Sequence, residues 1–305
     1  MPGGVGLDIG ASKWVLVDQK NPAVQIRGRT ADDPIQCLRE INAALLDNVG
    51  PTVPLGISFP GSLNKEGVVE SWPRRPTWVG CQLFEGMPWA DPCITLVLDD
   101  GICAALGERR RAGEGLDSYL CLTFGTGLGG VAVVDGLPRG SRSGGARTFG
   151  HLRVPGVTTP CPCGRQGCLQ AVVLGERRDR STLEELLAGA RRGYLSTVVA
   201  DFVTASGLDG VVLTGGLLGH VPEFADFLLR ELTEEFAGTG CDARLSSRPH
   251  ESALLGSLDL AVAATGGSLD ASFDYIRPRR DADRFTERHG RVLQGSVHSC
   301  SRRQR

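Results

Sequence analysis

The sequence predicts an α/β protein made of two similar halves, which we expect to form two domains around a cleft. Short apolar runs separated by turns alternate with stretches of helical periodicity along most of the chain. The order of strand, glycine turn and strand at residues 7–18 recurs at residues 118–136, which indicates a weak internal repeat. A chain of 305 residues, 41% of them hydrophobic, is long enough for two such units.

The first half of the chain begins with strands. Apolar runs at 4–10, 13–19 and 23–28 predict a three-stranded meander with tight, glycine-containing turns. A helix is predicted near residues 33–47, where four apolar residues share one face: Ile35, Leu38, Ile41 and Leu45. The apolar run at 53–59 predicts a buried strand, and the run at 94–100 predicts a strand that leads into a helix at 101–110.

The second half continues the alternation. After the repeated turn, the pattern predicts these elements: helical stretches near 181–206, a strand at 210–216, a helix near 221–235 and a last helix at 252–264. We therefore expect a first domain at 1–115 and a second at 116–266, with the last helix packing back toward the first domain. Residues 267–305 lose the periodicity and accumulate arginines, which predicts a flexible tail.

Charge and cysteine content exclude several classes of protein. A net charge of −2 offers no global basic field for a nucleic acid or an anionic membrane. The amino-terminal residues do not resemble a secretory leader and no apolar run is long enough to span a membrane, so we expect a cytoplasmic protein. Among ten cysteines, Cys161, Cys163 and Cys168 cluster closely, which favours a metal site over a disulfide framework.

The first glycine turn carries residues suited to a nucleotide. Asp8, Gly10, Ser12 and Lys13 place a carboxylate, an open backbone, a hydroxyl and an ammonium within six residues. Asp8 is expected to hold Mg²⁺ through water, while backbone N–H groups and Ser12 bind phosphate oxygens. The alternative is a polar hairpin without a ligand.

Two further glycine turns support the same interpretation. Gly125, Thr126 and Gly127 form a turn that can approach the same triphosphate from the other side. Gly215 and Gly216 follow a predicted strand and precede a helix, where they could admit an adenine ring. Taken singly, the turn at Gly125 is an ordinary hairpin, and the turn at Gly215 is an ordinary strand-to-helix turn.

Two adjacent carboxylates end the predicted strand at 94–100. Asp99 and Asp100 are therefore expected at the carboxyl edge of a sheet, where they would face the cleft. One of them is a candidate catalytic base. The competing interpretation is helix capping, which suits Asp100 well.

The clearest pattern is a set of metal ligands. His151, Cys161, Cys163 and Cys168 offer one imidazole and three thiolates, a closed tetrahedral set for a structural Zn²⁺. A chance cluster is the alternative.

These motifs resemble the ROK family of repressors, open reading frames and sugar kinases, from Gly6 to about Gly266. LDIGASK and FGTGLGG are similar to its two phosphate motifs, LTGG to its adenosine motif, and FGH followed by CPCGRQGC to its zinc signature. The resemblance implies an actin-like (ribonuclease H-like) ATPase fold, an ATP- and Mg²⁺-dependent kinase with structural zinc, and a homodimer. It makes Asp100 the catalytic base and places the zinc loop, with His151, at one wall of the acceptor pocket.

Several positions depart from that family. Thr148 and Gln170 stand where acidic residues usually hold sugar hydroxyls, and Asp99 and Ile102 replace the asparagines around the catalytic aspartate. Arg74 replaces the asparagine of the acceptor loop. Together with Arg142 and Arg147, it would make the pocket electropositive and suited to an acceptor that already carries phosphate, unless these arginines are simply solvated.

The resemblance leaves several functions to compare. A sugar, a cyclitol or a phosphate of either is the expected acceptor, with an ordinary glucokinase or N-acetylhexosamine kinase as the alternative. A ROK repressor would need a helix-turn-helix domain ahead of Asp8, where only seven residues stand, so we expect no nucleic-acid partner. A non-catalytic ligand-binding relative is the alternative from another class.

Overall fold

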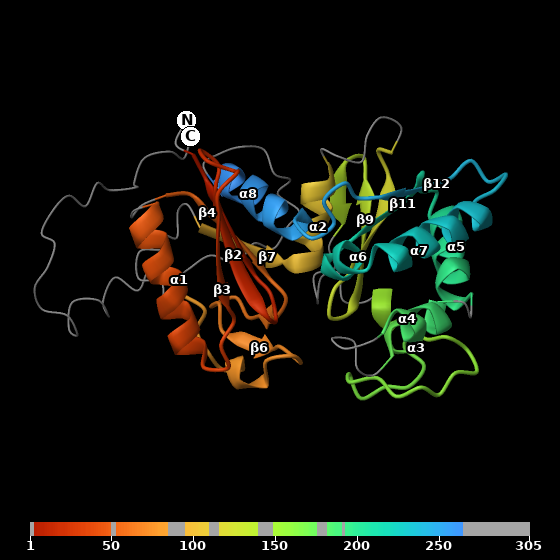
Figure 1. Cartoon of the computed structure of the whole chain (residues 1–305), viewed down its shortest axis with the longest axis horizontal. Coiled ribbons are helices and arrows are strands. Elements are labelled where there is room, and N and C mark those ends of the chain that lie inside the picture. The colour runs from red at the N-terminus through yellow and green to blue at the C-terminus, as the bar shows by residue number, and fades with distance from the viewer. Residues whose placement is uncertain are drawn as a thin grey trace, which may run out of the picture.

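The structure is a computed structural model that describes residues 3–49, 53–84, 95–109, 116–139, 149–175, 182–190 and 193–264. Two β-sheets lie beside each other, with helices α2 (Asp100–Arg109) and α8 (Ser252–Ala264) between them (Figure 1). The expected arginine-rich tail lies outside the described residues, as do Arg142, Arg147 and Thr148.

The first sheet has the strand order β3-β2-β1-β4-β7. Its strands are β1 (Val5–Ile9), β2 (Lys13–Asp18), β3 (Gln25–Arg29), β4 (Leu55–Phe59) and β7 (Thr95–Asp99). The first three form the predicted antiparallel meander, whereas β1, β4 and β7 run parallel. The carboxyl ends of these three parallel strands therefore meet at one edge of the sheet.

The second sheet has the order β10-β9-β8-β11-β12 and repeats this arrangement. Its strands are β8 (Tyr119–Phe124), β9 (Leu128–Val134), β10 (Leu137–Arg139), β11 (Gly210–Thr214) and β12 (Asp242–Leu245). Again an antiparallel meander is followed by two parallel strands. The internal repeat expected from the two glycine turns is thus present in the sheets.

Helices cover the sheets, and short elements join them. The remaining helices are α1 (Pro34–Asn48), α3 (Leu169–Leu174), α4 (Leu183–Ala190), α5 (Tyr194–Ala205), α6 (Gly216–His220) and α7 (Pro222–Glu235). The pattern did not predict the hairpin of β5 (Ser62–Leu63) and β6 (Val69–Ser71), the 3-10 helix η1 (Pro76–Trp78), or the short elements β10, β12, α3 and α6. These pieces have too few residues to establish a period.

Helix α1 begins where the sequence pattern places it. The side chain of Asp33 accepts hydrogen bonds from the backbone N–H groups of Ile35, at 2.9 Å, and Gln36, at 3.3 Å. Leu38, Ile41 and Leu45 are buried against the first sheet, whereas Ile35 is only half-buried in the first turn. The buried face of the helix therefore begins at Cys37 and not at Ile35 as predicted.

Helix α8 packs on the first sheet, although it follows the second sheet in the chain. Glycines allow this close approach: a Cβ atom on Gly56 of β4 would lie 1.9 Å from the carbonyl oxygen of Ser257. A Cβ atom on Gly256 would lie 1.7 Å from the carbonyl oxygen of Cys103 in α2. Residues larger than glycine would therefore force α8 away from β4 and α2.

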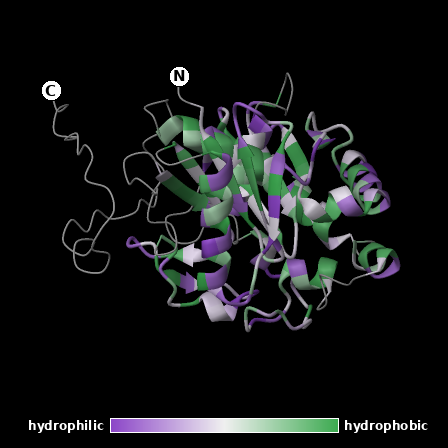
Figure 2. Ribbon diagram, turned by 60° about the vertical axis from the view of Figure 1, so that its left-hand side comes forward, coloured by the Kyte–Doolittle hydropathy of each residue, from purple (hydrophilic) through white to green (hydrophobic). Residues whose placement is uncertain are grey.

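The core consists of apolar residues on both faces of the two sheets. One cluster joins α1 to the first sheet, another joins α3, α4, α5 and α7 to the second, and a third lies between the sheets around α2. The strands are accordingly mostly hydrophobic in Figure 2. In the described part of the chain, no helix is both long and apolar enough to cross a membrane.

Candidate active site and zinc site

Asp8 lies near the carboxyl end of β1, beside the parallel strand β4. It pairs in register with Ser58, whose hydroxyl donates a 2.7 Å hydrogen bond to its carboxylate. Burial raises the pKa of Asp8 to about 6; the charge of Asp100 adds to the rise, while Ser58 and Lys13 oppose it. A bound cation would stabilise the ionised form of this buried carboxylate.

Asp99 and Asp100 follow at the same edge of the sheet. Because β7 is parallel to β4, with Asp99 beside Phe59, they lie one and two residues beyond the row that contains Ser58. Both carboxylates accept the backbone N–H of Gly101 at 3.0 Å. Because α2 begins at Asp100, the residue in the capping position is Asp99 and not Asp100, for which capping was the competing interpretation.

The buried thiol of Cys103 lies within reach of all these carboxylates. Burial raises its pKa, and the charges of Asp8, Asp99 and Asp100 raise it further. A thiol in the second turn of α2 is thus influenced by carboxylates from two different strands. The parallel pairing of β1, β4 and β7 is what brings them together.

The first glycine turn presents its polar side chains to solvent. The backbone N–H of Gly10 donates to the carbonyl of Lys13 at 2.9 Å and closes the turn. Thr30 supports it by donating from its hydroxyl to the carbonyl of Gly10 at 2.8 Å. Ser12 and Lys13 are exposed, so their hydroxyl and ammonium are accessible to a ligand.

The second and third turns lie at the ends of adjacent parallel strands, because Thr123 of β8 pairs with Thr214 of β11. The turn at Gly125, Thr126 and Gly127 is closed by a 3.0 Å hydrogen bond from the N–H of Gly125 to the carbonyl of Gly127. A Cβ atom on Gly125 or on Gly216 would meet no other heavy atom within 4 Å. These two glycines border open space.

Gly215 is required for a different reason. It has a φ of 110°, and a Cβ atom there would lie 2.3 Å from the carbonyl oxygen of Phe124. This glycine therefore allows β11 to pass close to β8. Of the pair, Gly216 is the residue with space for a ligand.

The loop that contains Arg74 and Arg75 connects the first and second glycine turns. Arg75 donates to the carbonyl of Ala11 in the first turn at 2.7 Å, and Arg74 donates to the carbonyl of Thr126 in the second at 3.2 Å. The loop is held by the buried Trp72 and Trp78, whose ring centroids lie 4.9 Å apart. The two packed tryptophans thus help to place Arg74 beside the second glycine turn.

The four predicted zinc ligands converge. The ligand atoms of His151, Cys161, Cys163 and Cys168 all lie within 4.8 Å of one another. The Sγ atoms of Cys163 and Cys168 are 3.7 Å apart, close to the spacing of about 3.8 Å expected for two thiolates bound tetrahedrally to one Zn²⁺. The residues therefore fit a closed structural zinc site.

Local backbone structure positions these ligands. The N–H of Cys161 bonds to the carbonyl of Arg165, the N–H of Gly164 bonds back to Cys161, and Cys168 precedes α3. Burial opposes ionisation of Cys163, but hydrogen bonds from Arg165, Cys161 and Cys168 outweigh it and lower the pKa of Cys163 to about 7. A lowered pKa favours the thiolate that binds zinc.

Gln170 links the candidate zinc ligands to the second glycine turn. Its Nε2 lies 3.2 Å from the Sγ of Cys161 and 3.3 Å from the Nδ1 of His151. Its Oε1 accepts the N–H of Leu128, which follows Gly127, at 3.4 Å. The glutamine proposed from the sequence as an acceptor contact thus also touches the metal cluster.

Two residues of this region were missed in the sequence. Ser58 was visible only as a hydroxyl inside an otherwise apolar strand, and Arg75 as the neighbour of Arg74. Their partners, Asp8 and Ala11, lie about 50 and 64 positions away in the chain. Such distant contacts leave no local pattern.

The two matching sheets, three glycine turns and zinc ligands define an α/β protein of the actin-like ATPase fold. The chain belongs to the ROK family, whose sequence model matches residues 4–186.

Among its relatives is the kanosamine kinase of Amycolatopsis mediterranei, 31% identical over 62% of this chain and 64% of that protein. The glucokinase of Thermotoga maritima is 29% identical over 55% of this chain and 56% of that protein. The matched segments thus span less than two thirds of either relative.

Solved structures share the fold. The ROK hexokinase from Thermus thermophilus has a TM-score of 0.67 at 23% identity and is matched over 87% of this chain and all of that one, 100%. A ROK glucokinase from Streptomyces griseus, solved with glucose and AMPPNP, has a TM-score of 0.65 at 22% identity and is matched over 86% of this chain and 99% of that one.

The raised pKa of Asp8 predicts a pH effect on folding. Between about pH 4 and pH 6 the unfolded chain releases the Asp8 proton while the folded chain retains it, so the free energy of unfolding falls as pH rises. Asp8→Asn removes this proton release. The unfolding free energy of the variant should therefore rise relative to that of wild type between about pH 4 and pH 6, and the difference should stay constant at higher pH.

Urea unfolding of the protein without Mg²⁺, at several pH values, measures this difference. Asp47→Asn, on the exposed side of α1, is the matched control and should show no such change. A difference between Asp8→Asn and wild type that stays flat from pH 4 to pH 7 would contradict the assignment.

Proposed function

We propose that this chain is an ATP-dependent kinase that transfers the γ-phosphoryl group to a hydroxyl of a sugar or sugar-like polyol. The observation that carries the proposal is the parallel pairing of β1, β4 and β7, which brings Asp8 and Asp100 to one sheet edge. Relatives named as kanosamine kinase and glucokinase support a sugar-like acceptor. The ROK glucokinase solved with AMPPNP supports a nucleotide donor.

The donor site is proposed at the three glycine turns. Asp8 would hold Mg²⁺ through water, and the bound ion would neutralise charge on the phosphates. The residues proposed to contact the nucleotide are Gly10, Ser12, Lys13, Gly125, Thr126, Gly127, Gly215 and Gly216. Within this set, Gly216 borders the open space suited to an adenine ring, and Gly215 shapes the turn.

Asp100 is proposed to act on the acceptor. Its carboxylate accepts the proton of the attacking hydroxyl as that oxygen bonds to the γ-phosphorus. The bond between the γ-phosphorus and the bridging oxygen breaks, and ADP leaves with the electron pair. Asp99 would orient the acceptor beside the base. Most of the rate enhancement would come from positioning and charge neutralisation.

The acceptor pocket is proposed to favour a cyclitol, a cyclitol phosphate or a sugar phosphate. Neutral Thr148 and Gln170 replace the usual acidic contacts, and Arg74 adds a guanidinium beside the Thr126 turn. His151 would contribute to the wall of this pocket through the zinc loop. An ordinary glucokinase or N-acetylhexosamine kinase is the alternative, and the relative named as a glucokinase favours the first of these.

Zinc is proposed to have a structural role. Three cysteines and one histidine leave no open coordination position, so the ion would order the loop of residues 151–168. Gln170 would transmit that order to the turn at Gly127, because it contacts Cys161 and the N–H of Leu128. A homodimer is also proposed, on the family resemblance alone.

The decisive test measures ATP consumption and product mass with hexoses, N-acetylhexosamines, cyclitols and their monophosphates. Turnover of a cyclitol or a phosphorylated acceptor supports the full proposal. Turnover of glucose alone supports the kinase and rejects the electropositive pocket. MgATP binding without turnover of any acceptor would favour a non-catalytic ligand-binding protein.

Arg74→Asn restores the residue that is usual in the family and should change acceptor choice. Arg74 is exposed, so if it binds an acceptor phosphate, kcat/KM for a phosphorylated acceptor should fall about tenfold, because one charge-assisted hydrogen bond is lost. The kcat/KM for the unphosphorylated counterpart should stay equal or rise. Arg230→Asn, exposed on α7, is the control, and equal losses for both acceptors would contradict acceptor-phosphate recognition.

A further inference from the structure

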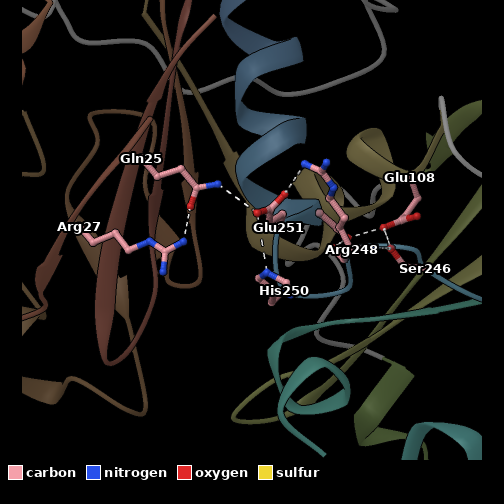
Figure 3. Close-up of polar contacts among 8 residues, drawn as sticks. Gln25, Arg27, Glu108, Ser246, Arg248, His250 and Glu251 are labelled. Carbon is pink, nitrogen blue, oxygen red and sulfur yellow. Dashed lines mark hydrogen bonds and ion pairs between the residues drawn. The ribbon is translucent and has the colours of Figure 1, made fainter. Parts of the chain in front are cut away.

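Glu108 is a buried carboxylate on α2, the helix that begins with Asp100. The residue is only 1% exposed, and a buried charge is costly unless hydrogen bonds satisfy it. Its Oε1 atom accepts from the hydroxyls of Ser246, at 2.6 Å, and Thr214, at 3.2 Å, and from that of Ser252 in a short contact. Figure 3 shows the carboxylate directed toward Ser246.

The three hydroxyls come from different elements. Thr214 ends β11 immediately before Gly215 and is fully buried. Ser246 follows β12, and Ser252 begins α8. The hydroxyls of Thr214 and Ser252 are also 2.6 Å apart. One carboxylate therefore connects α2 to the second sheet and to the helix that returns to the first.

Close backbone packing limits where this carboxylate can lie. A Cβ atom on Gly107 would be 2.1 Å from the carbonyl oxygen of Ser252. The last turn of α2 is thus in contact with the first turn of α8. A shift of α8 or of the end of β11 would have to move α2 or break the hydrogen bonds of Glu108.

The segment between β12 and α8 has further contacts on both sides. The carbonyl of Pro249 accepts the N–H of Gly215 at 2.8 Å, which attaches the segment to the third glycine turn. Glu251 accepts from Gln25 of β3 at 3.1 Å and from Arg248 at 3.2 Å (Figure 3). Glu108 thus lies where the first sheet, the second sheet and the third glycine turn are connected.

We infer that Glu108 is a positioning residue that couples the Asp100 helix to the nucleotide turn at Gly215 and Gly216 through the hydroxyl of Thr214. This inference rests on the proposed function, because the turn matters only if it binds the nucleotide. Glu108 touches no substrate. It keeps α2, which begins with Asp100, in a fixed position relative to the turn at Gly215 and Gly216. A nucleotide bound at that turn is therefore aligned with Asp100.

The test measures MgATP affinity by isothermal titration calorimetry without an acceptor. Thr214→Val keeps the shape of the side chain and removes the hydroxyl, and Glu108→Gln keeps the shape and removes the charge. Each should weaken MgATP binding about tenfold, the factor that corresponds to one lost buried hydrogen bond to a charged group. Thr214→Ser retains the hydroxyl and should bind within about twofold of wild type.

A double variant and a matched control separate coupling from simple loss of stability. Glu108→Gln with Thr214→Val should bind no more weakly than the weaker single variant, because Glu108→Gln weakens the same hydrogen bond that Thr214→Val removes. Ser196→Ala also removes a buried hydroxyl of the second half, one that bonds to Gly193, and should bind MgATP like wild type.

The outcomes distinguish the inference from the proposed function. If wild type does not bind MgATP, the proposed function fails and the inference fails with it. If wild type binds and the Glu108 and Thr214 variants bind equally well, the inference alone is wrong. Additive losses in the double variant, or an equal loss in Ser196→Ala, would also overturn it.

Discussion

Asp100→Asn is expected to lower kcat by about two to four orders of magnitude, because an amide cannot accept the proton of the acceptor hydroxyl. Asparagine has nearly the same shape and can still accept the N–H of Gly101, now bonded to the carboxylate at 3.0 Å. The start of α2 and the affinity for MgATP should therefore be largely retained. Initial rates and calorimetric MgATP affinity, measured on the same preparation, test both expectations.

The same variant has a second readout at Asp8. The charge of Asp100 contributes to the raised pKa of Asp8, so Asp100→Asn should lower that pKa. The fall in unfolding free energy, which begins near pH 4, should then end below pH 6, because only the folded-state pKa of Asp8 changes. Asp47→Asn should change neither kcat nor this pH dependence. If Asp100→Asn retains more than about a tenth of wild-type kcat, Asp100 is not the base.

Loss of the zinc site is the second change with a large expected effect. The purified protein should contain one zinc per chain, and Cys168→Ser, at a fully buried ligand, should remove it. Without the ion, residues 151–168 lose the centre on which their four ligands converge. The unfolding midpoint should then fall by roughly 5–10 °C.

Metal analysis and thermal unfolding measure these effects. Cys241→Ser is a matched control, since that half-buried cysteine bonds to the carbonyl of Leu208 and lies outside the cluster. It should keep the zinc and the midpoint. A wild-type protein that is free of zinc after purification in zinc-containing medium, with an unchanged midpoint after chelation, would contradict a structural zinc site.

Local patterns were sufficient for much of the fold. Alternating apolar runs located the three strands of the first meander and β8 and β9 of the second, and helical spacing located α1, α7 and α8. The zinc ligands could also be selected in the sequence, since three of them lie within eight residues and share the donor chemistry that zinc prefers. These features depend on neighbours in the chain, so a sequence pattern contains them.

Other residues of the site could not be identified from local sequence patterns. Ser58 contacts Asp8 only because β1 and β4 are parallel neighbours, and Arg74 contacts Thr126 across 52 positions. Glu108 is the clearest case: in the sequence it is an ordinary charged residue near the end of a helix. It is buried because α8 returns to the first sheet and brings Ser252 against it.

The sequence by itself determined the two repeated α/β halves, the glycine turns, the cluster of one histidine and three cysteines, and the pair Asp99 and Asp100. The tertiary structure alone decided which carboxylates interact, which glycines border open space and how α2 is held between the sheets. The physical reason is that strand pairing and helix packing join residues far apart in the chain. Burial and hydrogen bonding then change their chemistry in ways that no local sequence pattern contains.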